Sequence, residues 1–216
     1  MPNGRLMYGF DPLCGWCYGF VPAMRSFRER HPDVSVDLVL GGLVTGDRVG
    51  PYREMILYIR GASERLEAVT GRRPSDAFFE RIGRADTVGS STEPSIVIAD
   101  VLDHEGHGPG LLFAHDVIEA HFEAGADLND RDLYERLYRE HGIARDVPPF
   151  DEPNRVAMAR RFQGARQLGI DSFPTVIALR DDGDGDNEPP AGRYERLPSL
   201  YEPAAFVAAA ERALGL

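Results

Sequence analysis

The stretch YGFDPLCGWCYGFVP, residues 8–22, contains both cysteines of this chain. The apolar run RLMYGF at residues 5–10 predicts a strand that ends in a turn at the following Asp-Pro. Helical spacing of apolar side chains follows over residues 15–30, and VSVDLVLGG at residues 34–42 predicts a second strand. The cysteine pair therefore lies between the strand and the helix of a β-α-β unit.

The cysteine spacing, C-x-x-C, indicates redox chemistry. Cys14 is expected at the first turn of the helix, where unpaired backbone N–H groups and the positive end of the dipole stabilise a thiolate. Cys17 lies one turn further along the same face, where it can resolve a mixed disulfide. In an intracellular protein this arrangement is typical of a thiol–disulfide oxidoreductase. We therefore assign Cys14 as the nucleophile and Cys17 as the resolving thiol.

Two other uses of the pair are disfavoured. A structural disulfide between Cys14 and Cys17 would close a very short loop, and such a loop gives little stabilisation. A zinc site would need two further ligands, and the two-residue spacing of His104 and His107 is outside the usual range. We predict no metal site.

Composition limits the location and the partners. The chain has 216 residues, 43% of them hydrophobic, and a formal net charge of -11, which disfavours nucleic acid as a partner. No apolar run approaches the ~18 residues that span a bilayer, so we expect no membrane association. The N-terminus has no basic segment followed by an apolar one, so we expect a cytoplasmic protein.

The rest of the chain completes a fold. Helical patterns fill roughly residues 50–169, and PTVIALR at residues 174–180 predicts a strand. The acidic segment 181–192 predicts a hairpin tip, residues 193–201 its partner strand, and Pro203 the start of a last helix. This β-α-β, helical, β-β-α order predicts an α/β thioredoxin-like fold with a large helical domain inserted after the second strand.

We place the domain boundaries accordingly. Residues 1–45 and 150–216 form the expected thioredoxin-like domain, and residues 46–149 form the inserted helical domain. The helical patterns are strongest at Tyr52–Leu66, Ser75–Ile82, Pro94–His104, Leu111–Ala124, Asp130–His141 and Pro153–Leu168. We expect helix ends at three places: a cap and a first-turn proline in Thr92-Glu93-Pro94, a cap at Asn129 or Asp130, and a C-terminal glycine at Gly169.

A proline at the start of the third strand is the second candidate site. Phe173, Pro174 and Thr175 follow a helix and a loop, where thioredoxin-fold proteins carry a cis-proline loop that packs against the dithiol. An ordinary trans proline at the start of an edge strand is the alternative.

The sequence resembles the DsbA family of the thioredoxin superfamily, within it the cytosolic branch of predicted protein-disulfide isomerases with a CGWC motif. The resemblance is carried by DPLCGWCYGF, GGLVTGDRVGP, STEPSIVIADV, DLNDRDLY and LGIDSFPTVIAL. It implies a disulfide oxidoreductase or isomerase with no cofactor beyond its dithiol, with glutathione as a co-substrate at most. Its partners would be protein or small-molecule thiols and disulfides, with a thioredoxin or glutathione system for recycling. Phe173, Pro174 and Thr175 would bind the substrate.

Some positions depart from the family. Gly15 and Trp16 lie between the cysteines, where periplasmic relatives carry a proline and a thiolate-stabilising histidine, and Tyr8 stands where they carry a buried glutamate. We therefore expect a less oxidising dithiol. Trp16 is expected to form an apolar docking rim or, alternatively, to shield the thiols. Asp11 could relay protons to the resolving thiol or could simply form the turn or cap the helix.

Two rival functions remain. Glutathione-linked transferases of the kappa class and 2-hydroxychromene-2-carboxylate isomerases share the fold but usually carry a lone serine at the reactive position. A client-binding holdase would use the helical domain and leave the thiols incidental.

Overall fold

The computed structural model describes residues 4–180 and 194–216, so the expected hairpin tip at residues 181–192 lies outside the described residues. Strands β1 (Gly4–Phe10), β2 (Ser35–Leu40), β5 (Thr175–Arg180) and β6 (Tyr194–Leu197) form one sheet in the order β2-β1-β5-β6. Strand β1 runs parallel to β2 and antiparallel to β5, and β6 is antiparallel to β5. The central strand β1 therefore carries the chain directly to the cysteine pair.

The helices follow the predicted order, with small differences at their ends. They are α1 (Gly15–Arg30), α2 (Ile56–Thr70), α3 (Asp76–Gly83), α4 (Thr92–Glu105), α5 (His107–Phe122), α6 (Arg131–Glu140), α7 (Glu152–Gln167) and α8 (Pro203–Leu214). The expected fold class, a thioredoxin-like sheet with helices inserted after the second strand, is confirmed.

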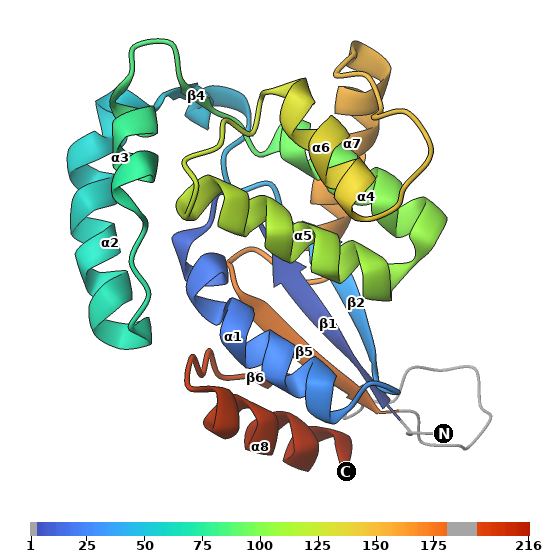
Figure 1. Cartoon of the computed structure of the whole chain (residues 1–216). Helices are drawn as coiled ribbons and strands as arrows, with labels where there is room; N and C mark the ends of the chain where they lie inside the picture. Colours follow the sequence, from blue (N-terminus) through green and yellow to red (C-terminus); the bar gives the residue numbers. More distant parts are fainter. Residues whose placement is uncertain (1–3, 181–193) are drawn as a thin grey trace.

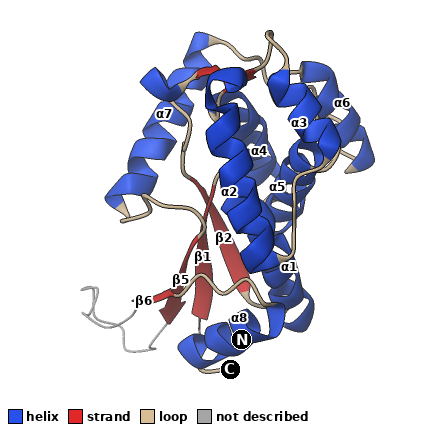
Figure 2. Ribbon diagram, turned by 90° about the vertical axis from the view of Figure 1, so that its left-hand side faces the viewer, coloured by secondary structure: helices blue, strands red, loops and turns tan. Residues whose placement is uncertain are grey.

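Helices cover both faces of the sheet. Helices α1 and α8 pack together through aromatic rings, with the ring centroids of Phe20 and Phe206 4.8 Å apart. Helix α7 lies on the opposite side of the sheet from α1 (Figures 1 and 2). Alternate residues of β1, Leu6, Tyr8 and Phe10, are fully buried, as expected for a central strand whose pleat directs every second side chain to the same face.

The inserted helices α2 to α6 lie at one end of the sheet, where the strands β1 and β2 end (Figure 1). Three short features there were not predicted. Residues 52–55, expected to open a helix, form the 3₁₀ turn η2 (Tyr52–Met55). The two-residue strands β3 (Gly50–Pro51) and β4 (Val88–Gly89) pair beside it, and a second 3₁₀ turn, η1 (Gly46–Arg48), precedes them. Such short pairs lack the alternating pattern by which a strand is recognised.

The helix ends follow the expected chemistry, with one correction. Asp130 caps α6 by accepting a hydrogen bond from the N–H of Asp132, and Gly169 has a φ of +74°, the left-handed conformation expected after α7. Helix α4, however, already begins at Thr92, and Ser91 occupies the cap position without making a capping bond. Its hydroxyl is used elsewhere, as described below. No helix in the described part of the chain combines the length and apolar content that a membrane crossing requires.

Candidate dithiol active site

Cys14 is the N-terminal cap of α1. Strand β1 ends at Phe10, and the turn that follows is closed by a 3.1 Å hydrogen bond from the Cys14 N–H to the carbonyl of Asp11. The Cys14 sulfur accepts a 3.4 Å hydrogen bond from the backbone N–H of Cys17. A cap residue receives N–H groups that have no partner within the helix, so the position favours negative charge on the sulfur.

Cys17 lies deeper than Cys14. Its side chain has no exposed surface, whereas Cys14 retains 5%, and both thiols are free. Burial raises the pKa of the Cys17 thiol well above its ordinary value, and the adjacent Cys14 raises it further. The backbone of Asp11 partly opposes this shift by hydrogen bonding to the Cys17 sulfur. Cys17 is therefore held as a neutral thiol behind the more accessible Cys14.

The loop before β5 lies against the dithiol. The Phe173–Pro174 peptide bond is cis, which excludes the trans alternative. The Cys14 thiol donates a 3.4 Å hydrogen bond to the carbonyl of Phe173. The Thr175 hydroxyl donates to the Ser172 carbonyl at 2.7 Å and accepts from Arg196 at 2.8 Å, which holds the loop on the sheet. The structure thus brings Phe173, Pro174 and Thr175 to the cysteine pair.

Two glycines after β2 leave room for aromatic rings, one from the loop and one from α7. A Cβ atom at Gly41 would lie 1.9 Å from the Phe173 ring, and one at Gly42 would lie 2.6 Å from the Phe162 ring. Gly42 also has a φ of +72°, which disfavours other residues. The two residues that follow β2 are therefore glycines, and aromatic rings occupy the space that larger side chains would need.

An apolar cleft opens beside Cys14, with a volume of about 370 Å³. Helix α2 and the cis-proline loop form its walls, and its lining includes Leu13, Trp16, Leu43, Tyr58, Leu66, Phe78, Phe122 and Phe173. The Trp16 ring packs against Tyr201, with centroids 5.5 Å apart. Gly15 also lines the cleft and faces Leu66 of α2. Gly15 and Trp16 thus form part of the cleft wall beside the dithiol.

Two polar side chains of the cleft were not recognised in the sequence as partners. The Tyr52 hydroxyl lies 3.3 Å from Nε2 of His121, and Nδ1 of His121 lies 3.0 Å from the Ala126 carbonyl. Because that carbonyl can only accept, Nδ1 carries the proton, and Nε2 accepts from Tyr52. Burial lowers the pKa of His121 to about 4, so the pair stays neutral.

Solved structures resemble this fold over nearly the whole chain. The cytosolic disulfide reductase DsbM from Pseudomonas aeruginosa aligns with a TM-score of 0.79 and 25% sequence identity, covering 98% of each chain. The chain has the DsbA-like form of the thioredoxin fold.

Further structures share the fold of this DsbA-like protein. DsbM with glutathione aligns with a TM-score of 0.73 and 23% identity over 98% of this chain and 100% of that one. A probable DsbA oxidoreductase from Streptomyces coelicolor aligns with a TM-score of 0.60 and 19% identity, over 98% and 90% of the two chains. No protein-family model and no curated protein sequence matches the chain.

Asp11 of the DsbA-like protein is fully buried and joins three segments. One carboxylate oxygen accepts from the Leu13 N–H at 2.9 Å and the Ser91 hydroxyl at 3.0 Å, and the other accepts from the Leu43 N–H at 2.6 Å. Burial nevertheless raises its pKa to about 6, because desolvation outweighs these hydrogen bonds. Asp11 forms the turn, which is one of the roles considered for it from the sequence. The Asp11 carboxylate does not cap α1, because the sulfur of Cys14 does so.

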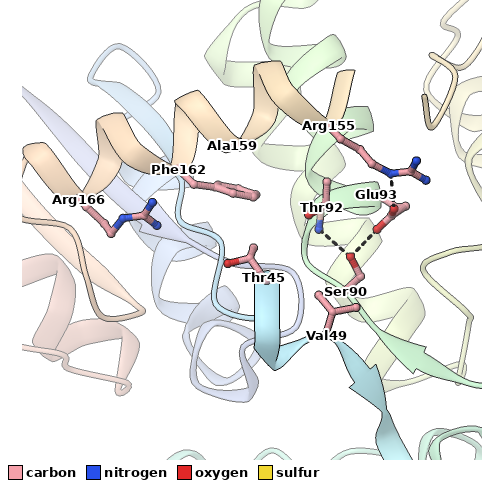
Figure 3. A pocket seen from close by; sticks show the side chains of 10 residues that line it. Thr45, Val49, Ser90, Thr92, Glu93, Arg155, Ala159, Phe162 and Arg166 are labelled. Atoms are coloured by element: carbon pink, nitrogen blue, oxygen red, sulfur yellow. Dashed lines mark hydrogen bonds and ion pairs between the residues drawn. The ribbon is translucent and has the colours of Figure 1, made fainter. Parts of the chain in front are cut away.

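A second cavity, of about 430 Å³, lies away from the thiols between α7 and the start of α4 (Figure 3). The Glu93 carboxylate accepts from the hydroxyl of Ser90 and pairs with Arg155 across it, and Phe162 lies along its α7 wall. Neither cysteine lines this cavity of the DsbA-like protein. Among the described residues no three His, Cys, Asp or Glu side chains are grouped as a metal site.

Proposed function

We propose that this DsbA-like protein is a thiol–disulfide oxidoreductase that acts through Cys14 and Cys17. The observation that carries the proposal is the placement of Cys14: its sulfur caps α1, is the more exposed of the two, and lies 3.4 Å from the cis-proline loop. This is the geometry that a nucleophilic thiolate needs, with N–H groups on one side and a backbone edge for the substrate on the other.

The reaction has two exchange steps. The Cys14 thiolate attacks a substrate disulfide, forms a mixed disulfide and releases one substrate thiolate. Cys17 then attacks Cys14, and the second substrate thiolate leaves. The substrate gains two electrons, and the protein is left with a Cys14–Cys17 disulfide.

Phe173 would position the substrate. Its carbonyl already accepts a hydrogen bond from the Cys14 thiol. A substrate peptide that lies extended along residues 173–175 would place the sulfur of its disulfide beside Cys14. Gly15 and Trp16 would contact the substrate from the α1 side, since both line the cleft. Asp11, buried beside Cys17, would accept the proton that the resolving thiol loses.

We propose reduction as the working direction, with glutathione as the source of electrons. The similarity to a disulfide reductase, also solved with glutathione, supports both points. A cytoplasmic location fits the same relative, which is described as cytosolic. A thioredoxin system could supply the electrons instead, since any dithiol reductant can reduce the Cys14–Cys17 disulfide.

Turnover of a peptide disulfide with glutathione tests the proposal in three proteins. Wild type should turn over, Cys14→Ser should be inactive, and Cys17→Ser should accumulate a mixed disulfide on Cys14 that mass spectrometry detects. Full activity of Cys17→Ser together with glutathione conjugation would instead indicate a transferase. Undiminished protection of an unfolding client by both variants, with no turnover in wild type, would indicate a holdase.

A further inference from the structure

An arginine of the neighbouring strand holds the cis-proline loop. Strand β6 places Arg196 directly opposite Ile177 of β5, two residues after Thr175. Side chains alternate between the two faces of a strand, so Thr175, Ile177 and Arg196 share one face, and a long side chain can reach its diagonal neighbour. The Arg196 guanidinium makes this diagonal contact and donates a 2.8 Å hydrogen bond to the Thr175 hydroxyl.

The same nitrogen of Arg196 also donates to the Ser172 hydroxyl, at 2.9 Å. The guanidinium is therefore bound to residues one position before and two positions after Phe173, whose carbonyl accepts the hydrogen bond of the Cys14 thiol. Successive Cα atoms are about 3.8 Å apart, so the guanidinium is fixed within a short stretch of chain from the nucleophile.

Much of this guanidinium remains available for a further partner. An arginine side chain carries five N–H donors. Arg196 uses one terminal nitrogen on the loop, and its other nitrogens make no hydrogen bond or ion pair with any residue that the structure describes. The side chain is also exposed. Its positive charge and its remaining donors can therefore bind a carboxylate from solvent through charge-assisted hydrogen bonds.

The charge around the dithiol is otherwise unfavourable to anions. The chain has a formal net charge of -11. The described lining of the cleft beside Cys14 contains no arginine, and the chain has no lysine. That lining does contain Asp171, the residue before Ser172. An anionic thiol that approaches Cys14 is therefore repelled unless a cation offsets these acids, and Arg196 is placed to do so.

We propose that Arg196 is a specificity-determining residue that binds a carboxylate of the thiol reacting at Cys14 and so favours anionic thiols such as glutathione. The proposal rests on the function proposed above and names the residue that selects the electron donor. Glutathione carries a carboxylate at each end, and an extended tripeptide spans about 10 Å. One of its carboxylates can therefore reach the guanidinium while its sulfur lies at Cys14.

The reaction that Arg196 would favour is the reduction of the oxidised dithiol. One glutathione thiolate attacks the Cys14 sulfur, the Cys14–Cys17 bond breaks, and its electron pair leaves on Cys17, which takes up a proton. A second glutathione thiolate attacks the sulfur of the glutathione bound to Cys14, and Cys14 leaves as a thiolate. The dithiol gains two electrons, and the two glutathiones end as their disulfide. Arg196 contacts none of the reacting atoms and acts by holding the thiol along residues 173–175.

Glutathione and its diethyl ester are matched probes, because they share one backbone and one thiol and only glutathione carries carboxylates. The oxidised protein is mixed with either thiol and quenched with acid, and its free thiols are counted by mass spectrometry after alkylation. The readout is the ratio of the two rate constants, glutathione over diethyl ester. We expect Arg196→Gln to lower this ratio by about two- to five-fold, the effect of losing an exposed charge pair.

Two further measurements separate the charge of Arg196 from its support of the loop. Arg196→Lys keeps the charge without the planar fork that holds the two hydroxyls, so it should retain most of the wild-type ratio. The advantage of wild type over Arg196→Gln in this ratio should also shrink at high salt, because the exposed charges are then screened.

Arg212→Gln is the matched control. Arg212 is exposed and lies at the other end of β5, where its carbonyl accepts a hydrogen bond from Arg180. Its loss removes the same charge and should leave the ratio at the wild-type value. The proposal is overturned if Arg196→Gln keeps the wild-type ratio, even where both rate constants fall together, because Arg196 then only supports the loop. It is also overturned if Arg212→Gln lowers the ratio as much. A wild-type disulfide that neither thiol reduces would instead refute the proposed function itself.

Discussion

The Cys14 thiol donates a hydrogen bond to the carbonyl of Phe173, a residue 159 positions further along the chain. The two residues belong to separate elements, the start of α1 and the loop before β5, which meet because β5 pairs with β1. The space for Phe173 is provided by a third segment, the end of β2, where Gly41 has no side chain. Activity should therefore depend on a residue that does not contact the thiols.

Gly41→Ala tests this dependence. The added Cβ would lie 1.9 Å from the Phe173 ring, so the ring and its loop must move. We expect a loss of disulfide reduction and a destabilisation of about 1–3 kcal/mol, measured by urea unfolding. Gly164→Ala, within α7 and with no atom within 4 Å of its Cβ position, is the control and should stabilise by about 0.5–1 kcal/mol. Wild-type activity in Gly41→Ala would mean that the Phe173 position is unimportant.

The accessibility of the thiols predicts selective alkylation. Cys14 retains 5% of its surface and Cys17 none, and the pKa of Cys17 is raised by burial. Because the thiolate is the reactive form, iodoacetamide at neutral pH should modify Cys14 alone, and Cys17 should react only as the pH rises. Peptide mass spectrometry of the reduced protein measures this, and Cys14→Ser should remain unmodified. Equal labelling of the two cysteines would contradict the assignment of Cys14 as the nucleophile.

Trp16 is the only tryptophan of the chain and lies between the two cysteines, so its fluorescence should report their redox state. Oxidation changes the sulfur environment beside an indole that packs against Tyr201 and lines the cleft. We expect different emission intensities for the reduced and oxidised wild-type protein. A Cys14→Ser, Cys17→Ser double variant should give one spectrum under both conditions. If the emission of wild type is the same in the reduced and oxidised states, the indole lies away from the dithiol.

The Asp11 carboxyl predicts how stability depends on pH. Burial raises its pKa from 3.8 to about 6 in the folded protein. Between about pH 4 and about pH 6 the unfolded chain loses this proton while the folded protein keeps it, so the free energy of unfolding falls as the pH rises. Over the full titration of this carboxyl, a pKa shift of this size changes the free energy of unfolding by roughly 3 kcal/mol.

Asp11→Asn cannot titrate and provides the reference. The stability of wild type relative to Asp11→Asn, measured by urea unfolding of the reduced proteins, should decrease by roughly 2–3 kcal/mol between pH 4 and pH 7. A constant difference over this range would show that the carboxyl is ionised at its ordinary pKa.

Local sequence patterns predicted much of this fold. The apolar runs of β1 and β2, the helical periods, the cap at Asp130 and the glycine at 169 each depend on neighbouring residues, and all are confirmed. The cis peptide before Pro174 was expected from the likeness to thioredoxin-fold proteins, which carry such a proline at this place, and it is confirmed.

The contacts that complete the site could not be predicted in this way. Ser91 reaches Asp11 across 80 positions by donating its side-chain hydroxyl, and no local pattern singles this serine out. The Tyr52–His121 pair joins residues 69 positions apart. Neither pair has a local signature, because each joins residues that only the folded chain brings together. Tyr8 was noted at its position in the sequence, but only the fold reveals that its hydroxyl lacks an ordinary partner.

The most direct test of the central claim is a redox titration. The protein is equilibrated in glutathione buffers of graded potential, the free thiols are counted after acid quenching, and the titration is repeated with Cys14→Ser and Cys17→Ser. The account predicts that wild type passes reversibly from two free thiols to none in one two-electron transition, with an intramolecular Cys14–Cys17 disulfide identified by mass spectrometry. Neither variant should show that transition. A wild-type protein that forms no reversible intramolecular disulfide would contradict the assignment of this chain as a thiol–disulfide oxidoreductase.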